Sequence, residues 1–248
     1  MSVTSAEAQA KRRLIEATGV DEEAVERARS LKSVYVYEAP VRLWHWVNAL
    51  MITLLCVSGY FIGRPLPTMP GEASEHFLMG YIRFVHFAAG YILAIGLVGR
   101  AYWALVGNRY AREIFWLPIL QKAYWKEVLL MLKWYAFLAP RPSRYVAHNP
   151  MARLAMFFGY TLMTLFMIFS GFALYSMGTG MGSWQDVLFG WMFLIFDNPL
   201  TLQTWHRMGM WALVIFVVLH IYAAIREDIL GRQGTISTMF SGYRTFRD

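Results

Sequence analysis

The chain has 248 residues, of which 57% are hydrophobic and 17% aromatic, and its mean hydropathy is +0.38. It is too apolar for an ordinary soluble domain of this length, so we expect an integral membrane protein. The formal net charge of +7 could indicate a nucleic-acid partner, but membrane topology explains the basic residues better. The single cysteine, Cys56, excludes a disulfide framework, a thiolate cluster and a C-x-x-C-H motif for covalent haem attachment.

Residues 1–39 are polar and charged and carry no apolar stretch of the kind found in signal peptides, so we expect a soluble arm. Four apolar segments follow, and each is close to the roughly 20 residues that a helix needs to cross the hydrocarbon core. They cover residues 44–63, 81–107, 154–177 and 204–225. The pattern predicts an all-α fold, an integral membrane four-helix transmembrane bundle over residues 40–226, with a tail at 227–248.

Two further apolar stretches are unsuited to crossing a membrane. The segment from Glu113 to Leu138 is rich in Trp, Tyr and Leu but is interrupted by lysines, so we expect an interfacial helix between helices two and three. The stretch from Val187 to Phe196 is short and is followed by Asp-Asn-Pro. It is interpreted as an outer-loop or shallow interfacial helix, because it cannot span the bilayer.

Lysine and arginine are unevenly divided between the two sides of the predicted bundle. The N-terminal arm and the long connection between helices two and three are rich in both, whereas the opposite connections hold few, among them Arg64, Arg83 and Arg207. The positive-inside rule then places both termini, the arm, the tail and the middle connection in the cytoplasm. The remaining connections would be periplasmic, and the chain would be a multi-pass protein of a bacterial inner (plasma) membrane.

Histidine placement is the most informative feature of the sequence. His206 and His220 lie fourteen residues apart in one apolar segment, TWHRMGMWALVIFVVLHIY. Fourteen helical residues make nearly four turns and about 21 Å of rise, so both imidazoles project from one face near opposite edges of a core about 30 Å thick. Two more histidines, His45 and His86, stand near the starts of two other apolar segments.

Depth in the bilayer sorts these four histidines into pairs. With both termini cytoplasmic, His45 and His220 lie toward the cytoplasm, and His86 and His206 lie toward the periplasm. Imidazole inside a membrane is costly and usually functional, and paired histidines can hold haem iron. We therefore predict two non-covalent b-type haems, held by the pairs His45/His220 and His86/His206. For any single histidine, the alternative is a buried polar side chain that bonds to a neighbouring helix.

Arginines and one glycine could complete the haem sites. Haem propionates need cationic partners, and arginines stand near the predicted ligands at Arg42, Arg83, Arg207 and Arg226. Arginines at a membrane edge also snorkel or set topology without any ligand. Gly59 follows His45 by fourteen residues and could make room for the periplasmic-side haem, although glycine is also common in membrane helices for packing.

Five runs along the chain carry a resemblance to a known family. They are ATGVDEEAVERARSLKS, YVYEAPVRLWHWVNAL, RFVHFAAGY, HNPMARLAM and TWHRMGMW with HIY after it. Together they resemble the b-type cytochrome subunit of membrane-bound nickel–iron hydrogenases and, more broadly, the dihaem cytochrome subunits of formate dehydrogenase and thiosulfate reductase. The resemblance covers essentially the whole chain. It implies that His45, His86, His206 and His220 are axial ligands of haem iron.

The resemblance also implies a membrane anchor and electron conduit. Electrons from H₂, oxidised by a periplasmic hydrogenase, would pass through the iron–sulfur chain of its small subunit to the periplasmic-side haem and on to membrane quinone. This chain has no cysteine-rich motif that could activate hydrogen, so no catalytic residue is predicted in it. The small and large hydrogenase subunits would dock on the connections at residues 64–80 and 177–203, whose aromatic side chains equally suit packing against lipid headgroups.

Other functions share parts of this pattern. The chain could serve another quinone-linked oxidoreductase, such as formate dehydrogenase or thiosulfate reductase, or it could be a haem-free membrane anchor, which has no use for paired histidines. A metal-ion transporter would normally add carboxylates at the midplane. A dihaem cytochrome of the ascorbate-reducing kind would usually have more spans.

Quinone reduction needs a proton source and a polar pocket close to the last haem. His148, Asn149 and Arg153 lie at the cytoplasmic entry to the third predicted helix, at roughly the depth of His220. They are the candidates for the quinone pocket. An ordinary helix start, with asparagine capping and proline in the first turn, explains Asn149 and Pro150 equally well.

Overall fold

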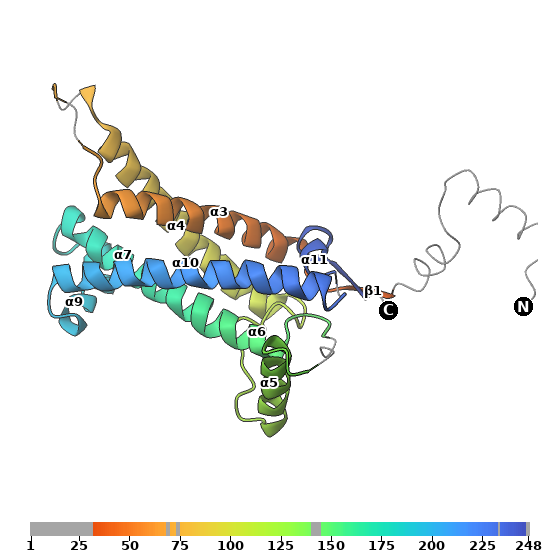
Figure 1. Ribbon diagram of the computed structural model, residues 1–248. Helices are drawn as coiled ribbons and strands as arrows, with labels where there is room; N and C mark the ends of the chain where they lie inside the picture. Colours follow the sequence, from red (N-terminus) through yellow and green to blue (C-terminus); the bar gives the residue numbers. More distant parts are fainter. Residues whose placement is uncertain (1–31, 68–69, 73–74, 140–144, 233, 247–248) are drawn as a thin grey trace, which may run out of the picture.

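Four long helices form the body of the protein in the computed structural model, which describes residues 32–67, 70–72, 75–139, 145–232 and 234–246. Each is long and apolar enough to cross a membrane. They are α3 (Ala39–Gly63), α4 (Leu78–Val106), the continuous run of α6 (Pro150–Ala155), η2 (Met156–Leu162) and α7 (Met163–Thr179), and α10 (Pro199–Ile229) (Figure 1). The predicted four-helix membrane bundle is confirmed.

Each membrane helix begins a few residues before its predicted start, and at three of the four the local sequence accounts for the boundary. Proline occupies the first turn of α3, α6 and α10, where a missing N–H costs nothing. The side chains of Asn149 and Asn198 cap α6 and α10 by accepting hydrogen bonds from the amides of Ala152 and Thr201. Apolar runs locate a span, whereas these polar caps decide its first residue.

The helices pack chiefly as two pairs, α3 with α4 and α10 with α7. Less than a third of the most apolar window of each span is buried within the chain, so most of the outer surface is suited to lipid. The third span contains the π-helix η2, which the sequence did not predict. At Gly159 in η2 an added Cβ would lie 2.7 Å from Cδ2 of Phe216, so glycine allows η2 to approach α10 closely.

One end of the bundle, called here the sheet end, carries the short helix α11 (Thr235–Ser241) and a two-stranded antiparallel sheet (Figure 1). Strand β1 (Lys32–Tyr35) pairs with β2 (Tyr243–Phe246), so the end of the predicted arm and the predicted tail fold together. Arg244 is buried there and donates hydrogen bonds to the carbonyls of Val146 and Ala147. Most of the arm lies outside the described residues.

The connection between the second and third spans contains α5 (Lys122–Tyr135), which lies across the direction of the long helices at the sheet end (Figure 1). The predicted helix over residues 113–138 is therefore too long, because Pro118 lies in the turns that precede α5. One face of α5 is buried, at Tyr124, Val128, Met131 and Trp134. This spacing gives an amphipathic helix, as the sequence indicates.

The opposite end of the bundle, called here the far end, carries α8 (Trp184–Phe189) and α9 (Met192–Ile195) between the third and fourth spans (Figure 1). The predicted short helical segment at residues 187–196 thus consists of parts of two short helices. Neither is long enough to cross a bilayer.

Candidate functional site

The four predicted histidines lie in two groups, one at each end of the bundle. At the sheet end, His45 of α3 faces His220 of α10, with ring centroids 6.4 Å apart and ring planes inclined at 53°. The Nδ1 atom of His45 is buried and has no hydrogen-bond partner. Phe216 stacks on His220 with centroids 5.8 Å apart, so the close approach at Gly159 helps to fix this ring.

The spacing of the sheet-end pair fits one metal atom between two imidazoles. Metal–nitrogen bonds to histidine are about 2.0–2.1 Å, so an atom bound from opposite sides holds the two ring centres roughly 6 Å apart. The observed 6.4 Å is close to this value. The residues present therefore suit a bis-histidine haem iron.

At the far end, His86 lies on α4 and His206 on α10. Each Nδ1 atom meets a serine hydroxyl of a different helix, Ser58 of α3 for His86 at 2.9 Å and Ser170 of α7 for His206 at 2.7 Å. Small residues leave space for both rings. An added Cβ at Gly59 would lie 3.1 Å from Cε1 of His86, so glycine at this position admits the imidazole of His86.

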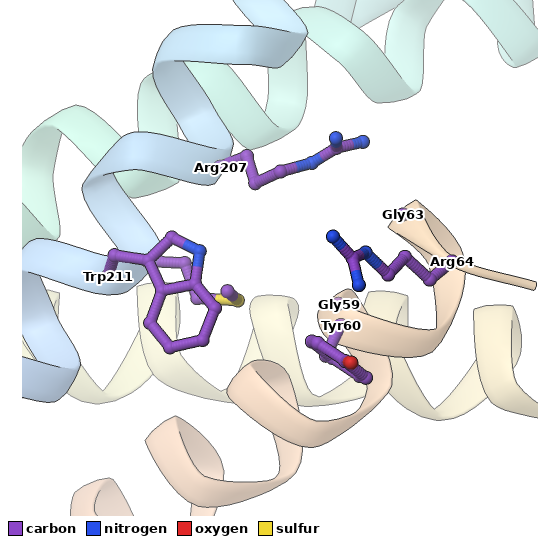
Figure 2. Close-up of a pocket in the computed structure, with 7 residues that line it drawn as sticks. Gly59, Tyr60, Gly63, Arg64, Arg207 and Trp211 are labelled. Atoms are coloured by element: carbon purple, nitrogen blue, oxygen red, sulfur yellow. The ribbon is translucent and has the colours of Figure 1, made fainter.

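A cavity of about 310 Å³ opens beside this far-end pair, between α3 and α10. It is lined by Gly59, Tyr60, Gly63, Arg64, Arg207, Met210 and Trp211. Figure 2 shows Arg64 and Arg207 extending into the gap from opposite helices. An added Cβ at Gly63 would meet the Arg207 guanidinium at 3.0–3.1 Å, so glycine at this position admits the arginine. The cavity therefore combines open space with two cations, which suits an anionic group.

From the sequence, Arg207 is a predicted partner of a haem propionate, whereas Arg64 serves only to orient the chain in the membrane. The spacing of Gly59 and Gly63 is the sequence feature that could have indicated Arg64 as a site residue. Residues four apart share a helix face, so these two glycines indicate a face kept open for a neighbour, and Arg64 follows directly.

The other arginines named from the sequence are placed differently. Arg83 is exposed and does not line the far-end cavity. Arg42 donates to the carbonyl of Phe240, in the C-terminal segment, while its Nε is buried without a partner. Arg226 is buried, donates to the carbonyls of Trp134 and Tyr135, and lies over both rings, so it fastens α5 to α10, while its role toward a haem stays a prediction.

Arg100 is a buried cation that was not predicted from the sequence as a site residue. It lies near the sheet end of α4 and is only 4% exposed. Its guanidinium stands 5.3 Å from the ring of Trp44, the neighbour of His45 in the chain, and 5.6 Å from that of Phe115. Its Nε and Nη1 atoms have no hydrogen-bond partner. A buried cation without an ion partner is costly, so the position suits an anionic ligand.

His148, predicted for the quinone pocket, lies in a polar cluster at the sheet end. Its Nδ1 is 3.0 Å from a carboxylate oxygen of Glu113 and 3.1 Å from the hydroxyl of Tyr37. Burial, and after it the Glu113 carboxylate, raise the pKa of Tyr37, so this hydroxyl keeps its proton at neutral pH. The cluster thus brings a carboxylate, an imidazole and a phenol into contact.

The other two residues predicted for that pocket make structural contacts. Asn149 caps α6, and its Nδ2 donates to Glu227 at 3.2 Å. Tyr135 donates to the same carboxylate at 2.9 Å, and burial followed by Glu227 raises the pKa of Tyr135. Arg153 donates to the carbonyl of Trp116, and its Nε is buried without a partner. Of the three predicted residues, His148 is the one best placed to exchange a proton.

Comparison with known proteins decides the family. Residues 36–242 match the family described as prokaryotic cytochrome b561. The chain belongs to that family. It is 60% identical over 236 residues to the probable Ni/Fe-hydrogenase B-type cytochrome subunit of Cupriavidus necator, a match covering 95% of this chain and 97% of the relative.

Two further relatives extend the comparison. Identity is 57% over 223 residues to the probable Ni/Fe-hydrogenase B-type cytochrome subunit of Azotobacter chroococcum, which covers 90% of this chain and 93% of the relative. It is 46% over 224 residues to the probable Ni/Fe-hydrogenase 1 B-type cytochrome subunit of Escherichia coli (strain K12), covering 90% and 95%. As a member of a cytochrome b family, the chain is a multi-pass membrane protein of electron transport that binds haem b.

Proposed function

We propose that this cytochrome anchors a nickel–iron hydrogenase to the membrane and passes its electrons to membrane quinone through two haems. The observation that carries the proposal is the placement of histidines along α10, where His220 faces His45 at the sheet end and His206 lies at the far end, next to the cavity lined by Arg207. The names of the relatives support the hydrogenase as the partner.

His45 and His220 would hold one haem, and His86 and His206 the other. A haem bound by two imidazoles supplies a one-electron redox centre whose iron has no free position for a substrate. Arg64 and Arg207 would bind propionates of the far-end haem, and Arg100 and Arg42 would do so at the sheet end. Bonding to propionates would also satisfy the unpartnered guanidinium nitrogens of Arg100 and Arg42.

The orientation follows from charge, with the sheet end in the cytoplasm and the far end in the periplasm of a bacterial inner membrane. Large apolar side chains stay exposed on the far-end connections, including Met181 at 99% and Leu194 at 87%. An exposed apolar patch of this kind suits a protein partner, so the hydrogenase small subunit would dock there. Lipid headgroups are the competing contact.

Quinone would be reduced at the sheet end, close to His220. The cluster of His148, Glu113 and Tyr37 supports this location, because quinone reduction consumes protons and these groups can relay them from the cytoplasm. Asn149 would hold the entry to the third span in place, and Arg153 would supply positive charge near the quinone oxygen.

Removing one histidine from each pair should separate the two haems. His206→Ala should lose the far-end haem alone and His220→Ala the sheet-end haem alone, because each ligand serves one iron. A pyridine haemochrome assay of the purified variants would then give one haem per chain instead of two. Full haem content in both variants would show that the pairing is wrong.

Neutralising the far-end arginines should change the midpoint potential of one haem only. Arg207→Gln or Arg64→Gln should lower one midpoint potential, because the lost positive charge stabilises the reduced centre. Partly exposed ion pairs are worth about 0.2–1 kcal/mol, or roughly 10–40 mV for one electron. Redox titration measures the shift, with Arg83→Gln, outside the cavity, as the control. Unchanged potentials in both cavity variants would remove these arginines from the haem site.

The order of electron transfer can be tested with single-ligand variants of the whole complex in membranes. His45→Ala should abolish H₂-dependent quinone reduction while H₂ still reduces the far-end haem. His86→Ala should stop H₂ from reducing either haem, because an electron would have to cross most of the membrane in one step. Absorption spectra under H₂ report both results. Equal haem reduction in the two variants would contradict the relay.

The proton source can be tested without disturbing the haems. His148→Gln should slow H₂-dependent quinone reduction by about a hundredfold, the usual worth of general acid catalysis, at unchanged haem content. Lys126→Gln is the control, because Lys126 is exposed on α5 at the sheet end and lies outside the proposed docking surface. A rate equal to that of the unmodified protein would exclude His148 from proton transfer.

A further inference from the structure

The histidines at the two ends of the bundle differ in the hydrogen bonds of their Nδ1 atoms. At the far end, the Nδ1 atoms of His86 and His206 each contact a serine hydroxyl, at 2.9 and 2.7 Å. Ser58 is 6% exposed and Ser170 is fully buried. At the sheet end, Nδ1 of His45 is buried and has no hydrogen-bond partner among the residues that the structure describes. The serine contacts therefore belong to one pair and not to both.

The serine bonds fix where the histidine protons lie. The hydroxyl of Ser58 is 2.5 Å from the carbonyl oxygen of Leu54, and that of Ser170 is 2.6 Å from the carbonyl oxygen of Phe166. A carbonyl can only accept a hydrogen bond, so each serine hydroxyl donates its single hydrogen to a carbonyl of its own helix. Its oxygen must then accept a hydrogen from the imidazole, which places that hydrogen on Nδ1.

A neutral imidazole carries one hydrogen, so Nε2 of His86 and of His206 is left with a free lone pair. Nε2 is then the nitrogen that can bind a metal.

We propose that Ser58 and Ser170 are positioning residues for the far-end haem. They select the tautomer of His86 and His206, hold both rings in orientation, and make Nε2 a stronger donor than it is in the sheet-end pair. A hydrogen bond from the outer ring nitrogen has these effects on metal-bound histidine generally. Stronger donation favours oxidised iron, so the serines lower the midpoint potential of the far-end haem. This inference rests on the proposed role of His86 and His206 as axial ligands.

The test compares Ser58→Ala and Ser170→Ala with Ser176→Ala in the complete protein purified from membranes. Ser176 is a matched control, because it is buried on α7 and its hydroxyl bonds to the Ala173 carbonyl of the same helix. In either test variant, redox titration should show one midpoint potential shifted upward and the other unchanged. Haem at the shifted site should be retained about tenfold less tightly, the lower end of the usual cost of losing such a bond.

Rescue separates the hydrogen bond from simple packing. Ser170→Thr keeps a hydroxyl that can bond to the same carbonyl, so its potential should return toward that of the unmodified protein. The proposal is overturned if the alanine variants leave both potentials and haem retention unchanged, if the shift is downward, or if Ser176→Ala shows the same shift. Failure of the ligand assignment itself would look different, because His86→Ala and His206→Ala would then keep both haems.

Discussion

The rise of a single helix sets the separation of the two histidine pairs. Helix α10 runs without interruption over Pro199–Ile229, so His206 and His220 share one face about 21 Å apart. Helices α3 and α4 run in opposite directions, and each needs a histidine near its own first turns to meet one of these two. The first-turn prolines that begin α3 and α10 matter for the same reason, because each residue of shift would turn a ring by about 100° away from its partner.

Within lipid, polar groups must find partners inside the protein, and most of those described here do. Tyr160 donates to Asn48, and Thr161 donates to the carbonyl of Ile114. The clear exceptions in the spans include Nδ1 of His45 and two nitrogens of Arg100, and both residues flank Trp44, at the sheet end. Unsatisfied buried groups in a folded protein call for an explanation, and a bound anionic metal cofactor supplies one. The buried groups without partners therefore lie at the sheet end, where the histidine pattern also predicts a haem.

The four spans and the depths of the histidines could be predicted because they depend on local sequence: an apolar run, a helical repeat and a count of residues. Features that depend on distant contacts could not. The contacts of Arg226 are an example, because it donates to the carbonyl of Trp134, 92 positions away in the chain. The β1–β2 ladder joins residues still further apart, and neither strand is apolar enough to stand out. The π-helix η2 has no simple sequence signal, although Gly159 marks the close approach that accompanies it.

The chemistry of the two ends differs in the way that the proposed transfer of electrons to quinone requires. At the far end, the ring nitrogens bond to serine hydroxyls, which do not ionise at physiological pH and so keep the histidine hydrogens in place during a one-electron step. The sheet end places His148 in contact with both Glu113 and Tyr37, so an imidazole, a carboxylate and a phenol can pass protons along their hydrogen bonds. A fixed set of hydrogens suits entry of electrons from a protein partner, whereas quinone reduction must take up one proton for each electron. The distribution of ionisable groups therefore favours electron exit at the sheet end, independently of the lysine and arginine count that orients the chain.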